Sequence, residues 1–84
     1  MPKYIDFHQK LPPLPPEMLN QVRADIKAGK VDKAGVKGLG FIATKDGMGC
    51  CMTEAPNADA VCRSHEAKGI KLGKGDVHEM ATQI

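Results

Sequence analysis

The chain has 84 residues, of which 42% are hydrophobic, and it contains two Phe, one Tyr and no Trp. A single domain of this size buries only about 60 to 65% of its unfolded surface, so we expect a second copy, a metal ion or both to add stability. Twelve basic and ten acidic residues are scattered along the chain, without a basic stripe between aromatic residues and without about 18 consecutive apolar residues. This pattern argues against a nucleic-acid partner and against a membrane span.

The N-terminal segment has the period-two pattern of a half-buried strand. Over residues 3–9, Ile5 and Phe7 alternate with polar side chains that include Asp6 and His8. Successive side chains of a strand point to opposite faces. We therefore expect Ile5 and Phe7 to face the core, and Asp6 and His8 to line the open face of a sheet.

A helix and two strands are predicted next. Pro16 suits the first turn of a helix, where its missing amide costs nothing, and Gly29 is a suitable stop. Residues 36–44 predict a second strand, and residues 49–54 predict a third. The Asp46-Gly47 pair between them is typical of a hairpin turn.

The second helix has the clearest start signal in the chain. Asn57 can accept a hydrogen bond from an unpaired amide of the first turn, and Gly69 would end the helix. A step of 100° per residue places Val61, Cys62 and His65 on one stripe. We expect this stripe to face the sheet.

Residues 76–82 predict a last strand, which completes the order strand, helix, strand, strand, helix, strand. This order predicts an α+β, ferredoxin-like single domain over residues 1–84, with a four-stranded antiparallel sheet and both helices on one face. The other face would be open. A second copy usually covers such a face, so we expect a homodimer of the α+β barrel type.

Soft metal ligands are concentrated between residues 50 and 65. Cys62 and His65 are three residues apart on the predicted helix, a spacing that lets both side chains reach one point, and Cys50 or Cys51 could supply a third ligand. The alternative interpretation is that these side chains only pack in the core. Three cysteines, an odd number with two adjacent, suit free thiols in a reducing compartment, so we expect a cytoplasmic protein.

The chain resembles a small bacterial ferredoxin-like family, largely of unknown function, that includes a nickel-binding protein. The resemblance rests on residues 1–8, 51–56, 60–69 and 76–80, in the same order and at suitable distances. It implies that His8, Cys51 and His65 are metal ligands, with Asp6 at a further position of the family pattern, and that the metal is a divalent ion such as nickel or zinc. Residues 17–28 lack the histidine that relatives often carry there.

Two functional hypotheses with specific chemistry follow from these residues, beside a third in which the chain is a structural or interaction module whose polar residues carry no chemistry. The first is non-catalytic binding of a divalent transition metal by a homodimer involved in metal handling or response. The second is a small dimeric barrel enzyme, an isomerase or a cofactor-free oxygenase, that would act on a small molecule in a cavity near His8, with His8 as base and Asp6 orienting it. A site containing both His8 and His65 is hard to build on these expectations, because the two side chains should lie on opposite faces of the sheet.

Overall fold

Four antiparallel strands form one sheet in this computed structural model, which describes residues 1–84. The strand order across the sheet is β2-β3-β1-β4. The elements, in chain order, are β1 (Lys3–His8), α1 (Pro16–Ala28), β2 (Lys37–Ala43), β3 (Gly49–Glu54), α2 (Ala58–Ala67), the short 3₁₀ helix η1 (Lys74–Asp76) and β4 (Val77–Glu79). This order of strands and helices is the predicted ferredoxin-like arrangement, which is therefore confirmed.

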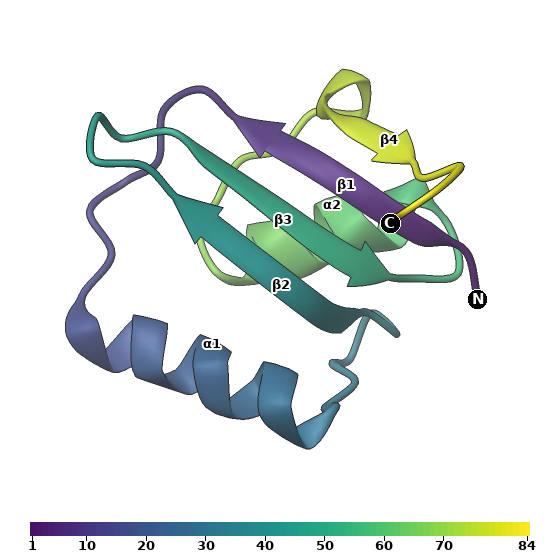
Figure 1. Ribbon diagram of the computed structural model, residues 1–84, viewed down its shortest axis with the longest axis horizontal. Coiled ribbons are helices and arrows are strands. Elements are labelled where there is room, and N and C mark those ends of the chain that lie inside the picture. The colour runs from purple at the N-terminus through teal and green to yellow at the C-terminus, as the bar shows by residue number, and fades with distance from the viewer.

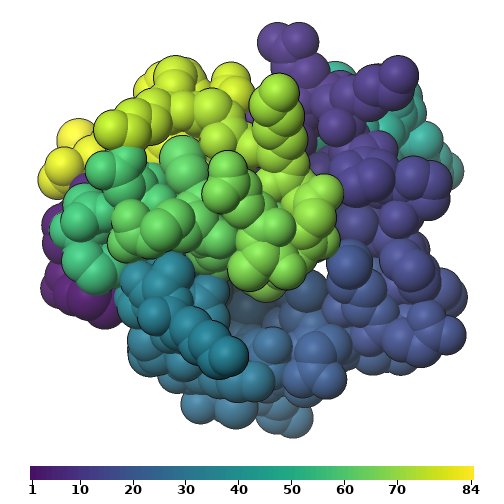
Figure 2. All heavy atoms as spheres, turned by 180° about the vertical axis from the view of Figure 1, so that it is seen from behind, coloured from purple at the N-terminus to yellow at the C-terminus, as the bar shows by residue number.

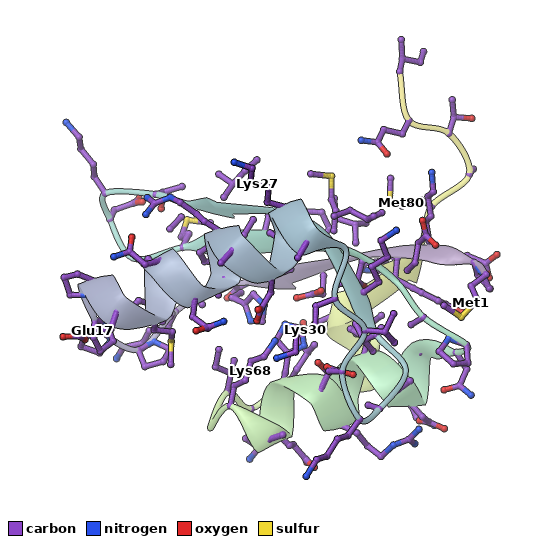
Figure 3. All side chains as sticks on the ribbon, turned by 90° about the horizontal axis from the view of Figure 1, so that it is seen from below. Met1, Glu17, Lys27, Lys30, Lys68 and Met80 are labelled. Carbon is purple, nitrogen blue, oxygen red and sulfur yellow. The ribbon has the colours of Figure 1, made fainter.

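Both helices lie on the same face of the sheet (Figures 1 and 3). Helix α2 crosses behind β1 and β3 in Figure 1, and α1 runs along β2. A side chain at Gly38 of β2 would meet Ile26 of α1 at 3.1 Å, so α1 approaches the sheet closely at this glycine. No helix covers the opposite face. Neither helix is both long enough and apolar enough to cross a membrane.

The ends of the helices follow the signals in the sequence. Helix α1 begins at Pro16 and is followed by Gly29, whose φ of +67° is the left-handed conformation that glycine adopts without strain. At the start of α2, the side chain of Asn57 accepts a hydrogen bond of 2.9 Å from the Ala60 amide. Local chemistry is thus enough to place both helices.

The last strand is shorter than predicted. We expected residues 76–82, but β4 pairs with β1 only over Val77–Glu79. Before it, the glycine-rich segment forms the 3₁₀ turn η1, and beyond it the Met80 amide donates a last hydrogen bond to the Lys3 carbonyl. The chain then leaves the sheet. The period-two pattern of the sequence therefore continues beyond the residues that pair with β1.

The prediction of which face of β1 is buried was wrong. Asp6 is fully buried and His8 is buried beneath the helices, whereas Phe7 is 49% exposed on the open face. Alternation establishes that Asp6 and His8 share a face, but it does not establish which face the helices cover. The polar side chains of β1 face inward, where His65 of α2 lies against the Asp6 carboxylate.

The apolar core lies between α2 and the sheet. Its buried members are Tyr4, Val36, Ala55, Ala60, Val61, Leu72 and Val77. Val61, which is completely buried, anchors α2, and His65 lies one turn further along the same helix face. The packing that holds α2 to the sheet therefore also places the imidazole of His65.

Candidate metal centre

Four potential metal ligands from three elements meet beneath α2. Asp6 and His8 come from β1, Cys51 lies opposite Asp6 on β3, and His65 comes from α2. One ligand atom from each of the four residues lies within 4.8 Å of all the others. Strand pairing and helix packing thus bring together residues that are up to 59 positions apart in the sequence.

The Asp6 carboxylate is at the centre of this cluster. Its Oδ2 atom lies 2.6 Å from His8 Nε2 and 3.2 Å from His65 Nε2. The Cys51 sulfur lies 3.8 Å from His8 Nε2, and the two imidazole rings are 5.1 Å apart between centroids. The Nε2 atoms of both histidines therefore lie close to one carboxylate oxygen.

Neither oxygen of the Asp6 carboxylate accepts a hydrogen bond of good geometry, although both are buried. The short distances to the two histidines bring the atoms together without directing an N–H onto the oxygens. An ionised carboxylate in such a place costs several kcal/mol unless a cation compensates its charge. That cation can be a proton on an imidazole or a bound metal ion.

A backbone hydrogen bond determines how His65 can act. Its Nδ1 lies 2.8 Å from the Val61 carbonyl, which can only accept, so Nδ1 carries a proton. Nε2 is then free to hold a second proton or a metal ion beside Asp6. Burial lowers the pKa of His65, but the nearby negative carboxylate of Asp6 and the hydrogen bond to the Val61 carbonyl outweigh it and raise the pKa above its usual 6.5.

The Cys51 thiol is held in its protonated form when no cation is near. Burial raises the pKa of Cys51 far above its ordinary value, and the negative charge of Asp6 raises it further. A divalent cation among these ligands would reverse this effect, because a coordinating thiol loses its proton to the metal. The site is thus suited to exchanging protons for a metal ion.

The geometry and the chemistry of the donors fit such an ion. Tetrahedral coordination at the usual bond lengths places ligand atoms about 3.3 to 3.8 Å apart. The separations here run from 2.6 Å, between Asp6 Oδ2 and His8 Nε2, to 4.8 Å at most, so an ion would require Asp6 and His8 to move apart and the widest pairs to move together. Two imidazoles, one thiolate and one carboxylate suit zinc or nickel better than the hard ions magnesium and calcium.

The structure brings together all three predicted ligands, His8, Cys51 and His65, and adds Asp6 as a fourth donor. The sequence contained a signal for Asp6, since it lies two residues before His8 and so shares its strand face. Cys51, paired with Asp6, lies on the inner face, which resolves the choice between Cys50 and Cys51.

Other candidates lie outside the cluster. Cys50 pairs with Phe7 on the open face, and Cys62 is half-buried at the flank of α2. His78 also lies on the open face, where its ring centroid is 5.9 Å from that of Phe7. Cys62 and His65 therefore do not form the helical ligand pair that their spacing suggested.

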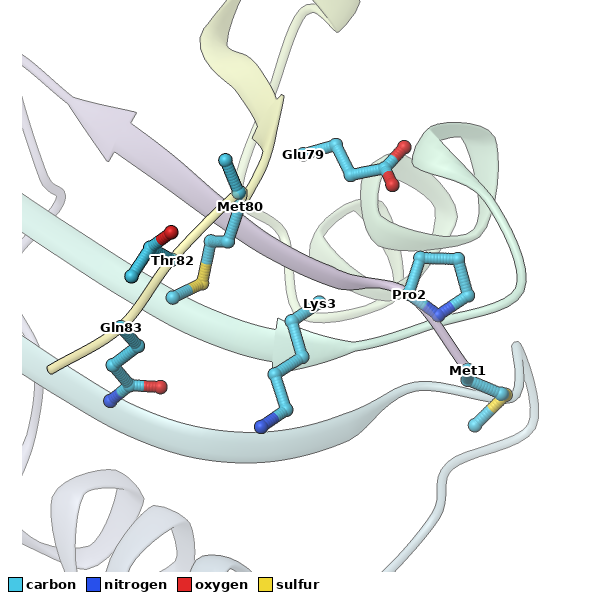
Figure 4. Close-up of a pocket in the computed structure, with 8 residues that line it drawn as sticks. Met1, Pro2, Lys3, Glu79, Met80, Thr82 and Gln83 are labelled. Atoms are coloured by element: carbon cyan, nitrogen blue, oxygen red, sulfur yellow. The ribbon is translucent and has the colours of Figure 1, made fainter.

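Two hollows on the surface lie away from the cluster. One, of about 340 Å³, is formed by the chain termini and includes Lys3 and Met80 (Figure 4). The other, of about 260 Å³, lies between α1 and β2 beside Phe41. Neither is lined by Asp6, His8 or His65. The enzyme hypothesis expected a cavity beside His8 on the open face of the sheet. That location is wrong, because His8 lies on the face that the helices cover.

The crystal structure of SCO4226 from Streptomyces coelicolor A3(2) is similar to this chain over nearly the whole of both proteins. The match covers 98% of this chain and 99% of that chain, with a TM-score of 0.71 and 25% sequence identity. No protein-family model matches the chain, and no curated protein is significantly similar to it in sequence. The structural similarity supports the ferredoxin-like arrangement of strands and helices.

Proposed function

We propose that this protein binds one divalent transition metal ion per chain, nickel or zinc, through Asp6, His8, Cys51 and His65. The observation that carries the proposal is the buried Asp6 carboxylate, which lacks hydrogen-bond donors while three further ligand atoms converge on it. A metal ion would neutralise this charge and satisfy all four side chains at once. The resemblance to a family with a nickel-binding member points to the same chemistry.

The proposed role is metal handling or response, without catalysis. Catalytic zinc sites keep one coordination position open for water or substrate, whereas closed sites fill all four positions with protein ligands. Here four donors from the chain are available to a tetrahedral ion, and three of these residues are buried. The three free cysteines are compatible with work in a reducing compartment such as the cytoplasm.

Replacing Cys51 by Ser tests the proposal, with Cys50→Ser as a matched control. The wild-type protein titrated with Co²⁺ or Ni²⁺ should develop a thiolate-to-metal charge-transfer band in the near ultraviolet at one ion per chain. Cys51→Ser should lose this band because it lacks the coordinating sulfur. Cys50→Ser should retain it, since Cys50 lies on the other face of the sheet. A band that disappears in Cys50→Ser and persists in Cys51→Ser would reject the assignment, as would a wild type that binds neither ion.

We further propose that two copies pair through the open faces of their sheets. Ile5, Phe7, Ile42, Cys50 and Met52 share this face, and Phe7 and Ile42 are 49% and 55% exposed. Exposed apolar side chains gathered on one surface are typical of an interface. At one end of this face, Glu54 pairs with Lys3 on one side and Lys37 on the other. Because positive and negative side chains lie side by side at this rim, two copies related by a two-fold axis can place opposite charges against each other.

The double change Phe7→Glu and Ile42→Glu should convert the dimer to a monomer, because it places four carboxylates in the apolar centre of the paired faces. Sedimentation equilibrium of wild type and variant at the same concentrations would measure this. The control is the double change Ala24→Glu and Ala28→Glu, which adds the same two negative charges per chain at exposed residues of α1, away from the open face, and should leave the dimer intact. A wild type that is monomeric at micromolar concentration would refute the proposed pairing.

A further inference from the structure

The loop that joins α1 to β2 is folded around the carboxylate of Asp32. This carboxylate accepts hydrogen bonds from the Ala34 amide at 2.9 Å and the Val36 amide at 3.0 Å. The Asp32 amide in turn donates to the Val36 carbonyl at 3.0 Å. The Ala34 and Val36 amides both donate to Oδ1, so the Oδ2 atom of Asp32 remains available to another group.

That remaining oxygen binds helix α2. The hydroxyl of Ser64 donates a hydrogen bond of 2.5 Å to Asp32 Oδ2, and Ser64 is only 3% exposed. Seen from behind, this loop (teal-blue) is in contact with α2 (green), whereas a hollow separates α2 from α1 (Figure 2). Burial raises the pKa of Asp32, but the hydrogen bonds from Ser64, Val36 and Ala34 together outweigh it and lower the pKa. The carboxylate therefore stays charged at neutral pH.

Ser64 immediately precedes His65, and the two side chains leave α2 about 100° apart. One is tied to the loop and the other faces Asp6. The bond from Ser64 to Asp32 therefore resists rotation of α2 about its own axis. His65 Nε2 lies roughly 7 Å from that axis, so a rotation of about 10° would move it by about 1 Å. Metal–ligand distances tolerate only about 0.2 Å.

We propose that Ser64 and Asp32 are positioning residues of the metal centre, which hold α2 at the rotation that brings His65 onto the ion. Neither residue belongs to the ligand cluster, and they act through His65 alone. The inference rests on the proposed metal binding. Partners that orient a ligand from outside the coordination shell typically contribute 10-fold to 100-fold to metal affinity.

Replacing Ser64 by Ala tests this inference by titration of the full-length protein with Co²⁺, followed by displacement with Zn²⁺. The expected result is a loss of affinity of about 10-fold or more. The visible d–d bands of Co²⁺ should also change shape, because the position of His65 in the coordination sphere is altered. Ser64→Thr, which keeps the hydroxyl, should restore both affinity and spectrum. Asp32→Asn should fall between wild type and Ser64→Ala, because Asn keeps one accepting oxygen for the loop amides while its NH₂ group faces Ser64, whose hydroxyl can then only accept.

Thr44→Ala is the control for a general loss of stability. The Thr44 hydroxyl accepts a 2.9 Å hydrogen bond from the Met48 amide and donates to Asp46, in a hairpin remote from the cluster. This variant loses hydrogen bonds away from the cluster and should bind Co²⁺ like the wild type, and urea unfolding of Thr44→Ala and Ser64→Ala would show how much stability each has lost. The positioning role is rejected if Ser64→Ala and Asp32→Asn bind Co²⁺ with wild-type affinity and spectrum. A wild type that does not bind Co²⁺ or Zn²⁺ rejects the metal proposal itself, which is a different result.

Discussion

Replacing Asp6 by Asn is expected to lower the affinity for Ni²⁺ or Zn²⁺ by about 100-fold or more. Asn has nearly the shape of Asp, so packing beneath α2 should be preserved. It removes the only carboxylate in the cluster and the charge that compensates the ion. Loss of partners outside the coordination shell already costs 10-fold to 100-fold, and loss of a central ligand should cost at least as much. Isothermal titration calorimetry of the apo-protein would measure the change.

Asp46→Asn is the matched control for this substitution. It removes one negative charge from an exposed hairpin residue, so it changes the net charge equally without touching the cluster. It should bind metal as tightly as the wild type. The metal-induced rise in melting temperature should likewise disappear in Asp6→Asn and persist in Asp46→Asn, because a ligand that binds only the folded state stabilises it in proportion to its affinity. Equal affinities of Asp6→Asn and wild type would remove Asp6 from the site.

Metal affinity is expected to rise steeply with pH in the mildly acidic range. Interactions with Asp6 and Val61 outweigh burial and raise the pKa of His65 above 6.5, and burial beside Asp6 raises the pKa of the Cys51 thiol. Without metal, both groups hold a proton below the His65 pKa, and coordination must displace both. Each displaced proton contributes a factor of about ten per pH unit. These two groups should therefore make the affinity rise at least about 100-fold per pH unit below the His65 pKa and at least about 10-fold per unit above it, because any proton held on His8 must be displaced as well.

Apparent dissociation constants for Zn²⁺ or Ni²⁺, measured between about pH 5.5 and 8 with a competing chelator, would give this dependence. The control is Cys51→Ser, in which one displaced proton is missing, so its slope should be smaller by about one at every pH. Cys50→Ser should follow the wild type. A wild-type affinity that does not change with pH would mean that neither His65 nor Cys51 exchanges its proton for the ion.

Much of the local structure could be predicted because short-range chemistry determines it. Pro16 and Gly29 bound the first helix, and Asn57 caps the second, through interactions within a few residues. The strand over residues 49–54 was predicted with its exact bounds. The last strand was predicted too long, because its end depends on where pairing with β1 stops, and that is a contact between distant segments.

The candidate site was only partly predictable. His8, Cys51 and His65 could be selected as ligand types in a family-like pattern, but the interior face of β1 was assigned to Ile5 and Phe7. A rule that places apolar residues inside fails here because β1 has polar residues against α2 and apolar residues on the open face. The positioning contact of Ser64 with Asp32 had no signal in the sequence, since it joins a loop to a helix 32 residues away.

The sequence by itself determined the order of elements, the helix caps and the fact that Asp6 and His8 share one face of a strand. These properties depend on backbone periodicity and on hydrogen bonds between near neighbours. Only the tertiary structure decided that this face is the one beneath α2, and that Cys51 and His65 converge there on the Asp6 carboxylate. The physical reason is that strand register and helix packing are set by contacts summed over the whole sheet, and no single segment of the sequence contains them.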